Sequence, residues 1–221
     1  MAKVPNGIEL AAGADAFAAD LKNTKDLFLK VYDIVAIFGG SGISRDSEYY
    51  VAAERLANIL AGHGVSIITG GGPGIMEAGN KGAQRAGTHA KSYGLQVSAI
   101  KEEIIDGADS FIDSGCCYNY KTLSVRLLTL ISSADAIVFF PGGYGTFEEL
   151  FCLLVRIKVG MLDAVPIYLY GSKFWKGLVD WLKSTVVCEG VINAEHIDFV
   201  NVEDDVEKIA SDLVKFISQK K

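Results

Sequence analysis

The sequence predicts an α/β fold in three layers, with a parallel sheet between two layers of helices. Short hydrophobic runs bounded by glycines alternate with longer segments in which hydrophobic residues recur at helical spacing. Three of the short runs end directly in a glycine cluster. Strands that alternate with helices of about ten or more residues form parallel sheets with right-handed crossovers. We therefore expect a Rossmann-like, doubly wound sheet.

The expected elements follow in order along the chain. Helical spacing in 10–30 predicts a leading helix across one edge of the domain, and the hydrophobic run 34–38 predicts a strand buried on both faces. No linker rich in proline, serine or charge is present, so residues 1–221 are expected to form one domain on which segment 1–32 packs. Further strands are expected at 65–69, 91–98, 110–113, 136–140 and 165–170, and helices at 46–62, 75–86, 118–132, 174–187 and 204–218 and between 145 and 165.

Composition and net charge limit the classes of binding partner that are expected. Of the 221 residues 50% are hydrophobic and 22% are charged, which indicates a large buried core. The net charge is −6, and the only basic run is Lys220-Lys221. Proteins that bind nucleic acid through its phosphates carry a basic face, so no nucleic-acid partner is expected. Backbone N–H groups can still bind a small anion.

Cysteine and histidine usage indicates a reduced protein without a metal. The 4 cysteines and 3 histidines have no spacing typical of a zinc site or a disulfide framework. The N-terminus lacks the pattern of a signal peptide, and no hydrophobic segment approaches the roughly 18 residues that a membrane span requires. We expect a cytoplasmic protein with no membrane partner.

Glycine clusters at 39–42, 70–74 and 142–145 follow three of the expected strands. Ligands of parallel α/β sheets bind beyond the carboxyl ends of the strands, where glycine lets the backbone approach phosphate oxygens. Glycine also serves tight turns, and that reading stays open for 39–42. Two common nucleotide motifs are absent: Arg45 stands where the dinucleotide fingerprint needs its third glycine, and no P-loop Gly-Lys-Ser/Thr follows any cluster.

The segment 141–149, Pro-Gly-Gly-Tyr-Gly-Thr-Phe-Glu-Glu, is the most specific in the chain. Its backbone N–H groups and the Thr146 hydroxyl can hold an anion, and we expect Glu148 and Glu149 in the first turn of the next helix. Acidic residues there also complement the helix dipole, which stabilises a helix by about 0.3–1 kcal/mol. Since adjacent side chains point in different directions, one glutamate can face solvent while the other faces the ligand.

Together with Gly70-Gly-Gly-Pro-Gly-Ile-Met-Glu77, this motif resembles the LOG (LONELY GUY) family, often mislabelled "possible lysine decarboxylase". The similarity extends from about residue 34 to residue 216 and includes 91–95 and 174–181. It implies a Rossmann-like homodimer that cleaves the N-glycosidic bond of a nucleoside 5′-monophosphate, such as AMP or a cytokinin riboside monophosphate. The products are the free base and ribose 5-phosphate. No cofactor and no metal are implied.

By position in these motifs, the resemblance implies that Arg126 and Glu149 are catalytic. Many members have a lysine after that arginine, where this chain has Leu127. Breaking the C1′–N bond builds positive charge on the ribose, which Glu149 would stabilise while it orients or deprotonates the attacking water. Arg126 would hold the 5′-phosphate or polarise the ribose or base. The expected substrate-binding residues are Gly40, Ser41, Gly71, Gly72, Gly74, Met76, Glu77, Gly142, Gly143, Gly145 and Thr146.

Other readings of these residues stay open. Arg126 can be an interface or ion-pair residue, Met76 can be core packing, and Glu77 can bond the backbone of its own loop. For the whole protein, one alternative is a non-catalytic nucleotide-binding or DNA-handling module, since fold does not fix function. The other is the decarboxylase of the label, which needs a lysine that forms a Schiff base with pyridoxal phosphate, and no lysine here has a persuasive setting.

Two of the expected helices are unusually hydrophobic. In 123–131 and 150–157, hydrophobic residues exceed what one sheet-covering face needs. The remaining hydrophobic surface favours a second buried face. We therefore expect a subunit interface and a homodimer.

Overall fold

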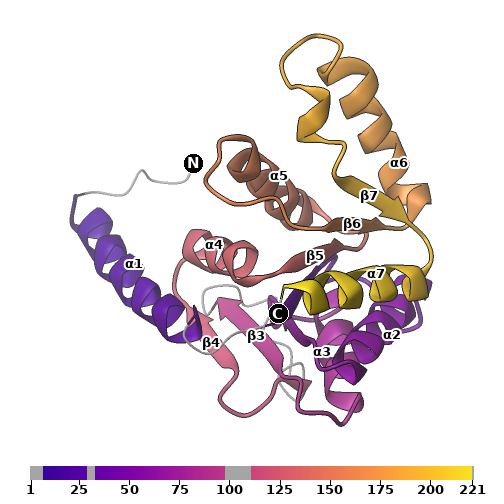
Figure 1. Ribbon diagram of the computed structural model, residues 1–221. Helices are drawn as coiled ribbons and strands as arrows, with labels where there is room; N and C mark the ends of the chain where they lie inside the picture. Colours follow the sequence, from indigo (N-terminus) through magenta and orange to yellow (C-terminus); the bar gives the residue numbers. More distant parts are fainter. Residues whose placement is uncertain (1–6, 29–32, 98–110, 221) are drawn as a thin grey trace.

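The computed structural model describes residues 7–28, 33–97 and 111–220. Seven strands in these ranges form one sheet in which all neighbours pair in parallel, in the order β4-β3-β2-β1-β5-β6-β7. Helices cover both faces, so the three-layer, Rossmann-like prediction is confirmed (Figure 1). The strands are Ile34–Phe38 (β1), Ser66–Thr69 (β2), Ser92–Val97 (β3), Cys117–Tyr120 (β4), Ala136–Phe139 (β5), Ile167–Tyr170 (β6) and Val200–Glu203 (β7), and the helices are Gly7–Phe28 (α1), Glu48–Gly62 (α2), Ile75–Arg85 (α3), Leu123–Ser133 (α4), Tyr144–Lys158 (α5), Ser172–Trp181 (α6) and Val206–Gln219 (α7).

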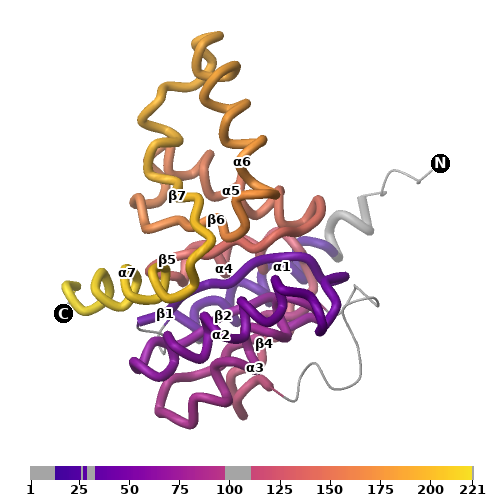
Figure 2. The backbone as a smooth tube through the Cα atoms, turned by 90° about the vertical axis from the view of Figure 1, so that its right-hand side faces the viewer, coloured from indigo at the N-terminus to yellow at the C-terminus, as the bar shows by residue number. Residues whose placement is uncertain are grey.

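Strand β1 shows why the central runs are hydrophobic throughout. Every residue of β1 is buried, and successive side chains point to opposite faces of the sheet. Val35 and Ile37 belong to the core under α2, α3 and α7, whereas Ala36 and Phe38 belong to the core under α4, α5 and α6. In Figure 2, turned by 90°, α7 lies along α2, as it does in Figure 1.

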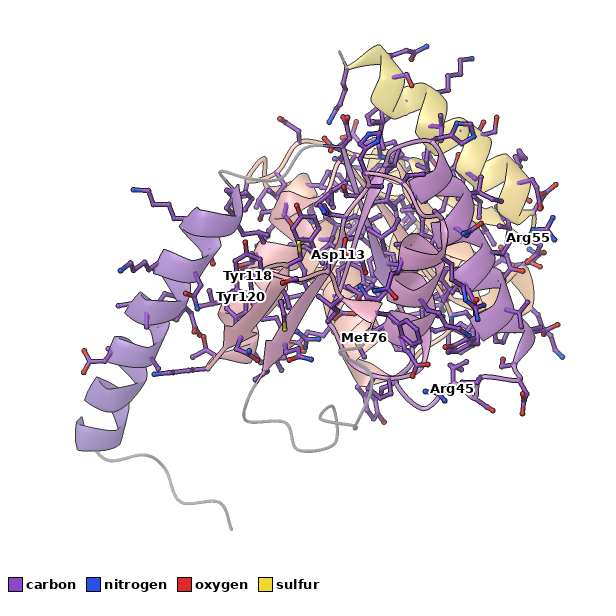
Figure 3. All side chains as sticks on the ribbon, turned by 90° about the horizontal axis from the view of Figure 1, so that it is seen from below. Arg45, Arg55, Met76, Asp113, Tyr118 and Tyr120 are labelled. Atoms are coloured by element: carbon purple, nitrogen blue, oxygen red, sulfur yellow. The ribbon has the colours of Figure 1, made fainter. Side chains whose placement is uncertain are left out.

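The leading helix lies at one edge of the sheet. Helix α1 contacts α4 and the edge strand β4. Figure 3 shows it beside Tyr118 and Tyr120 of β4. The other parts of the predicted segment 1–32, which are 1–6 and 29–32, lie outside the described residues. None of the helices in the described ranges has the length and apolar character needed to cross a membrane.

Both edge strands differ from the sequence prediction. The predicted strand 110–113 is wrong over its described residues, because the strand is β4 at Cys117–Tyr120. The helix predicted at 118–132 begins only at Leu123. Strand β7 was not predicted at all. Each edge strand pairs with one neighbour and mixes exposed with buried residues, so it lacks the hydrophobic run that marks the central strands.

The predicted helix 174–187 changes its geometry partway along. Regular α-helix ends at Trp181, and a π-helical segment, Leu182–Val186, continues it. A short 3-10 helix, Ala194–His196, precedes β7. Hydrophobic spacing alone does not distinguish these helix types here, because a segment of three to five residues is too short to show the difference in residues per turn.

Substitution of Leu130 tests how much the packing of α4 against the sheet contributes to stability. This side chain is fully buried, so Leu130→Ala is expected to lower the free energy of unfolding by about 2–5 kcal/mol through lost burial and a residual cavity. Equilibrium denaturant unfolding measures the effect. The matched control is Val51→Ala on α2, where the side chain is 57% exposed and the expected change is within about 0.5 kcal/mol. A loss at Leu130 as small as the control's would contradict this packing.

Candidate functional site

The cavity of interest lies where the chain reverses its direction across the sheet. The chain runs outward from β1 to β4 and then returns to place β5 on the other side of β1. The loops at the carboxyl ends of β1 and β5 therefore meet, and the N–H of Gly40 donates to the carbonyl of Pro141 at 2.9 Å. A cavity of about 510 Å³ opens beside them. Its lining consists of Phe38, Gly39, Gly40, Ser41, Met76, Leu123, Arg126, Leu127, Gly143, Tyr144, Gly145, Thr146, Glu148 and Glu149.

The N-terminus of α5 forms one wall of this cavity. Gly143 is the N-cap residue, and no side chain of the described residues caps this end of the helix. The first helical hydrogen bond runs from the N–H of Phe147 to the carbonyl of Gly143 at 3.1 Å. Gly143, Gly145 and the buried Thr146 all line the cavity. Unpaired N–H groups and the helix dipole make this wall suitable for an anion.

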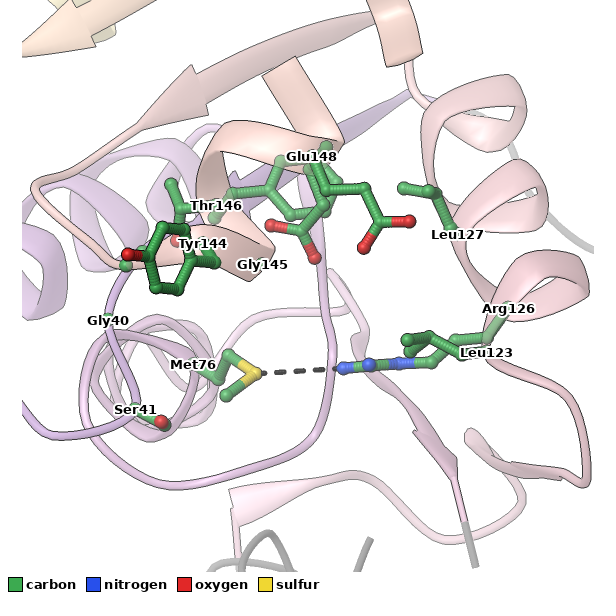
Figure 4. Close-up of a pocket in the computed structure, with 14 residues that line it drawn as sticks. Gly40, Ser41, Met76, Leu123, Arg126, Leu127, Tyr144, Gly145, Thr146 and Glu148 are labelled. Atoms are coloured by element: carbon green, nitrogen blue, oxygen red, sulfur yellow. Dashed lines mark hydrogen bonds between the residues drawn. The ribbon is translucent and has the colours of Figure 1, made fainter. Parts of the chain in front are cut away.

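Glu148 and Glu149 follow on the same helix. Because α5 begins at Tyr144, the two glutamates lie in its second turn rather than in the expected first turn. Both line the cavity, Glu148 being exposed and Glu149 half-buried. Figure 4 shows Glu148 on α5, on the opposite side of the cavity from Met76. Helix dipole complementation acts within the first turn, so it does not account for this pair.

Arg126 enters the cavity from the first turn of α4. Its side chain is 4% exposed, and Nε donates to the carbonyl of Leu95 at 2.7 Å. Nη2 donates to the carbonyl of Gly70 at 3.2 Å and lies 3.9 Å from the sulfur of Met76 (Figure 4). A guanidinium buried in this way against backbone carbonyls is held in a fixed orientation, unlike a surface ion-pair residue.

The second glycine cluster, 70–74, lies outside the cavity lining and contacts residues that form it. Gly71, Gly72 and Gly74 are buried and do not belong to the lining. The N–H of Gly71 already donates to the Thr69 hydroxyl at 3.0 Å, so it is not directed at a ligand. Gly74 has a φ of 66°, and a Cβ there would lie 2.7 Å from the carbonyl oxygen of Ser41. Glycine at position 74 allows this loop to approach the loop after β1 closely. Glycine at position 70 leaves room for the guanidinium of Arg126, which donates to the Gly70 carbonyl.

Glu77 lies in a separate polar network. Its carboxylate accepts hydrogen bonds from Arg45 at 2.8 and 3.0 Å and from the Tyr50 hydroxyl at 2.6 Å. Burial raises the pKa of Glu77, but the hydrogen bonds from Arg45 and Tyr50 outweigh burial and hold the pKa below its ordinary value. Burial, followed by the hydrogen bond to Glu77, raises the pKa of Tyr50. The network fastens the loop after β1 to α3.

The structure thus brings together most of the residues expected from the sequence. Six lining residues are not among the expected catalytic and substrate-binding residues: Phe38, Gly39, Leu123, Leu127, Tyr144 and Glu148. Leu123 could have been found, because it lies three and four residues before Arg126 and Leu127 on one face of a helix. The expected residues in the lining are Gly40, Ser41, Met76, Arg126, Gly143, Gly145, Thr146 and Glu149, and those outside it are Gly71, Gly72, Gly74, Glu77 and Gly142.

Within the described ranges, no group of three or more His, Cys, Asp or Glu side chains could hold a metal ion. The charged groups that line the cavity are the guanidinium of Arg126 and the two carboxylates of α5. They can bind an anion, stabilise a cation and position water. This inventory suits acid–base or electrostatic chemistry on a small polar ligand.

Substitution of Gly70 tests how closely Arg126 and Met76 pack against the backbone at this position. A Cβ at position 70 would overlap Nη2 of Arg126 and lie 2.6 Å from the sulfur of Met76. We expect Gly70→Ala to lower the free energy of unfolding by about 1–3 kcal/mol, because the buried side chains must move. The control is Gly177→Ala on α6, where a Cβ would contact no other part of the described chain within 4 Å and alanine favours the helix. Equal thermal stabilities of the two variants would contradict the close contact.

Glu77 makes stability depend on pH. The pKa of Glu77 is lowered by folding, so its stabilising contribution is present above the unfolded value of 4.5 and is lost as pH falls through the folded value. We expect Glu77→Gln to cost about 1.5 kcal/mol near neutral pH, at the low end for charged hydrogen bonds because Arg45 is largely exposed. Denaturant unfolding measured from near neutral pH to near pH 3 should show this difference shrinking. A difference that does not change with pH would contradict the lowered pKa.

Comparisons with known proteins agree with the fold. The molybdenum cofactor binding protein of the phototrophic bacterium Rippkaea orientalis is 19% identical, with a TM-score of 0.58, over 86% of this chain and 99% of that chain. The molybdenum cofactor carrier protein of Chlamydomonas reinhardtii is 21% identical, with a TM-score of 0.57, over 84% of this chain and 98% of that chain. No curated protein matches the sequence. At these identities the two structures share the fold of this chain.

The family model described as "Possible lysine decarboxylase" matches residues 76–213. The matched segment contains Met76, Arg126 and the whole motif 141–149, and thus most of the cavity lining. It begins after the glycine cluster 70–74 and is shorter than the similarity expected from the sequence. It nevertheless spans more than half of the chain. The chain therefore belongs to the possible lysine decarboxylase family, which is the LOG family that its two glycine-rich motifs resemble.

Proposed function

We propose that this protein hydrolyses the N-glycosidic bond of a nucleoside 5′-monophosphate, of the AMP or cytokinin riboside monophosphate type, to free base and ribose 5-phosphate. One observation carries the proposal. Arg126 from α4 and Glu148 and Glu149 from α5 line the same cavity, beside an uncapped helix N-terminus. This combination provides a place for a phosphate and carboxylates for the cation that forms when the bond breaks.

The phosphate is expected at the N-terminal wall of α5. The backbone N–H groups of the first turn and the Thr146 hydroxyl are donors, and the helix dipole favours a dianion there. Ser41, on the loop after β1, also lines the cavity. The two carboxylates lie one turn further along α5. A phosphate bound at the helix end would thus leave the ribose to reach the glutamates.

The carboxylates support the chemical step. As the C1′–N bond breaks, its electron pair leaves with the base, and positive charge spreads over C1′ and the ring oxygen. Glu149 stabilises this charge and accepts a proton from the attacking water, whose oxygen forms the new bond to C1′. The departing base takes up the proton that Glu149 accepted, so that the carboxylate is restored and one water is consumed. The fixed guanidinium of Arg126 polarises the base or the ribose hydroxyls or holds the phosphate.

Hydrophobic side chains offer a surface for the base. Met76, Leu123 and Leu127 line the cavity, and Leu127 stands where many members of the family have a lysine. No lysine occurs among the described lining residues. This inventory favours hydrolysis over Schiff-base chemistry, which requires a lysine amine.

We also propose that the protein is a homodimer. On α5, the side chains of Phe151 and Val155 are 37% and 54% exposed. Together with Trp181, they border an apolar groove between α5 and the segment that follows α6. Exposed apolar surface of this kind favours association.

A second candidate is a carrier that binds a phosphorylated ligand without turning it over. Leu127 favours it, because a lysine common in the family is replaced by a side chain that cannot act as an acid or a charge partner. The names of the two structural neighbours describe molybdenum cofactor binding and carrier proteins, which agrees with a carrier role for this fold. Turnover distinguishes the two candidates.

Ribose 5-phosphate release from a panel of nucleoside 5′-monophosphates is the decisive measurement. We expect turnover of at least one monophosphate and no turnover of the corresponding nucleoside. Glu149→Gln should lower kcat by about 10²–10⁴-fold, and Arg126→Ala by about 10²–10³-fold, because each removes one catalytic charge. Glu189→Gln, a matched change at an exposed residue outside the cavity, should retain wild-type activity.

Each outcome has a distinct meaning. Loss of activity in Glu149→Gln and Arg126→Ala with retention in Glu189→Gln supports hydrolysis at this cavity. Binding of AMP by the wild type without turnover of any monophosphate would overturn the enzyme proposal in favour of the carrier. Full activity of Glu149→Gln would overturn the assigned role of that carboxylate.

A further inference from the structure

A buried carboxylate lies outside the cavity and takes no part in the chemistry proposed above. Asp20 belongs to α1 and is 1% exposed. Both of its oxygens accept the N–H of Lys121 at 3.0 Å, and Oδ2 also accepts the N–H of Thr122 at 2.8 Å and the Thr122 hydroxyl at 2.6 Å. A charge on one helix is therefore bound by the backbone at the start of another helix, α4.

Helix α4 depends on this contact because it has no side-chain cap of its own. Thr122 is its N-cap residue, but the Thr122 side chain makes no capping hydrogen bond and instead donates its hydroxyl to Asp20. A carboxylate at a helix N-terminus bonds the orphan N–H groups and complements the dipole. Asp20, from a different element, bonds the N–H of the N-cap residue Thr122 and of Lys121 before it, and its charge complements the dipole at this end of α4.

The capped turn is the one that carries Arg126. The N–H of Arg126 donates to the carbonyl of Thr122 at 3.2 Å, which closes the first turn of α4. The guanidinium must then reach the carbonyls of Leu95 and Gly70 while it lines the cavity. A first turn that frays would move Arg126 away from both carbonyls.

Other residues of α1 contact β4 and α4 beside Asp20. Asn23 donates to the carbonyl of Asn119 at 3.2 Å, the hydroxyls of Thr24 and Thr129 lie 2.8 Å apart, and Leu27 is fully buried. Asp20, Asn23, Thr24 and Leu27 recur at spacings of three and four residues and form one face of the helix. Helix α1 precedes residue 76, where the match to the family model begins, so this contact comes from outside the matched segment.

We infer that Asp20 is a positioning residue for the candidate site: it orders the first turn of α4 and thereby holds Arg126 in the cavity. Its effect on the ordering of α4 follows from the geometry alone, and its effect on catalysis rests on the proposed function. Leu123 and Leu127 are carried by the same turn and its successor, so the hydrophobic side of the cavity depends on Asp20 as well.

The test compares two substitutions in α1 that each conserve the volume of the side chain. Asp20→Asn keeps the volume but replaces one acceptor oxygen by a donor that opposes the N–H and hydroxyl donors of α4. Thr24→Val, also of similar volume, removes a polar contact between α1 and α4 one helical turn further along, at Thr129. Both variants are examined in the full chain, well below their melting temperatures, for amide hydrogen exchange, AMP affinity and ribose 5-phosphate release.

In Asp20→Asn, we expect the amides of Lys121, Thr122 and Arg126 to exchange about tenfold faster or more, because charge-assisted hydrogen bonds are lost. AMP affinity and kcat/KM should fall by about tenfold for the same reason. In Thr24→Val, these amides and the affinity should stay at the wild-type level. Unchanged exchange in Asp20→Asn would overturn the inference, and so would equal losses in both variants, which would indicate general docking of α1.

Failure of the proposed function gives a different result. If the wild type neither binds nor cleaves any nucleoside monophosphate, the proposed function fails, whereas the exchange of the three amides still decides whether Asp20 orders α4. If the wild type is active and Asp20→Asn retains full activity despite faster exchange, the role of Asp20 in positioning Arg126 is overturned.

Discussion

The parallel pairing of β1 with β5 in the middle of the sheet is the constraint on which the rest of the site depends. After four strands laid down in one direction, the chain crosses back over β1, so the loops after β1 and β5 emerge side by side. The hydrogen bond between Gly40 and Pro141 joins the two loops. A cavity at this place is a consequence of the strand order. The side chains decide only what the cavity can bind.

The three glycine clusters have different structural roles where these loops meet. The clusters after β1 and β5 leave backbone exposed to the cavity, with Gly143 and Gly145 open to it. The cluster after β2 is buried and carries the Gly70 carbonyl that receives Arg126. Glycine is required there for the packing of loop against loop and loop against side chain. Similar sequence patterns thus line the cavity in two places and support it in the third.

Buried charges organise the elements around the cavity. Arg126 is bound by two backbone carbonyls, Asp20 by backbone N–H groups, and Glu77 by Arg45 and Tyr50. Burial of an unpaired charge is costly, so each of these contacts constrains the position of the element that supplies the partner. Glu77 fixes the loop after β1, and Asp20 fixes the start of α4. The elements that line the cavity are therefore held in part by Glu77 and Asp20, which lie outside the lining.

The sequence by itself determined the α/β class, the central strands, most of the helices and the motif 141–149, most of which lines the cavity. Hydrophobic period and glycine position are local properties, and they are strongest where a strand is buried on both faces. Only the tertiary structure decided the edge strands β4 and β7, because half-exposed strands lack a local pattern. It also separated the glycines of the lining from those behind it and paired Asp20 with Thr122, across 102 residues. Such long-range contacts depend on strand order, which periodicity along the chain does not encode.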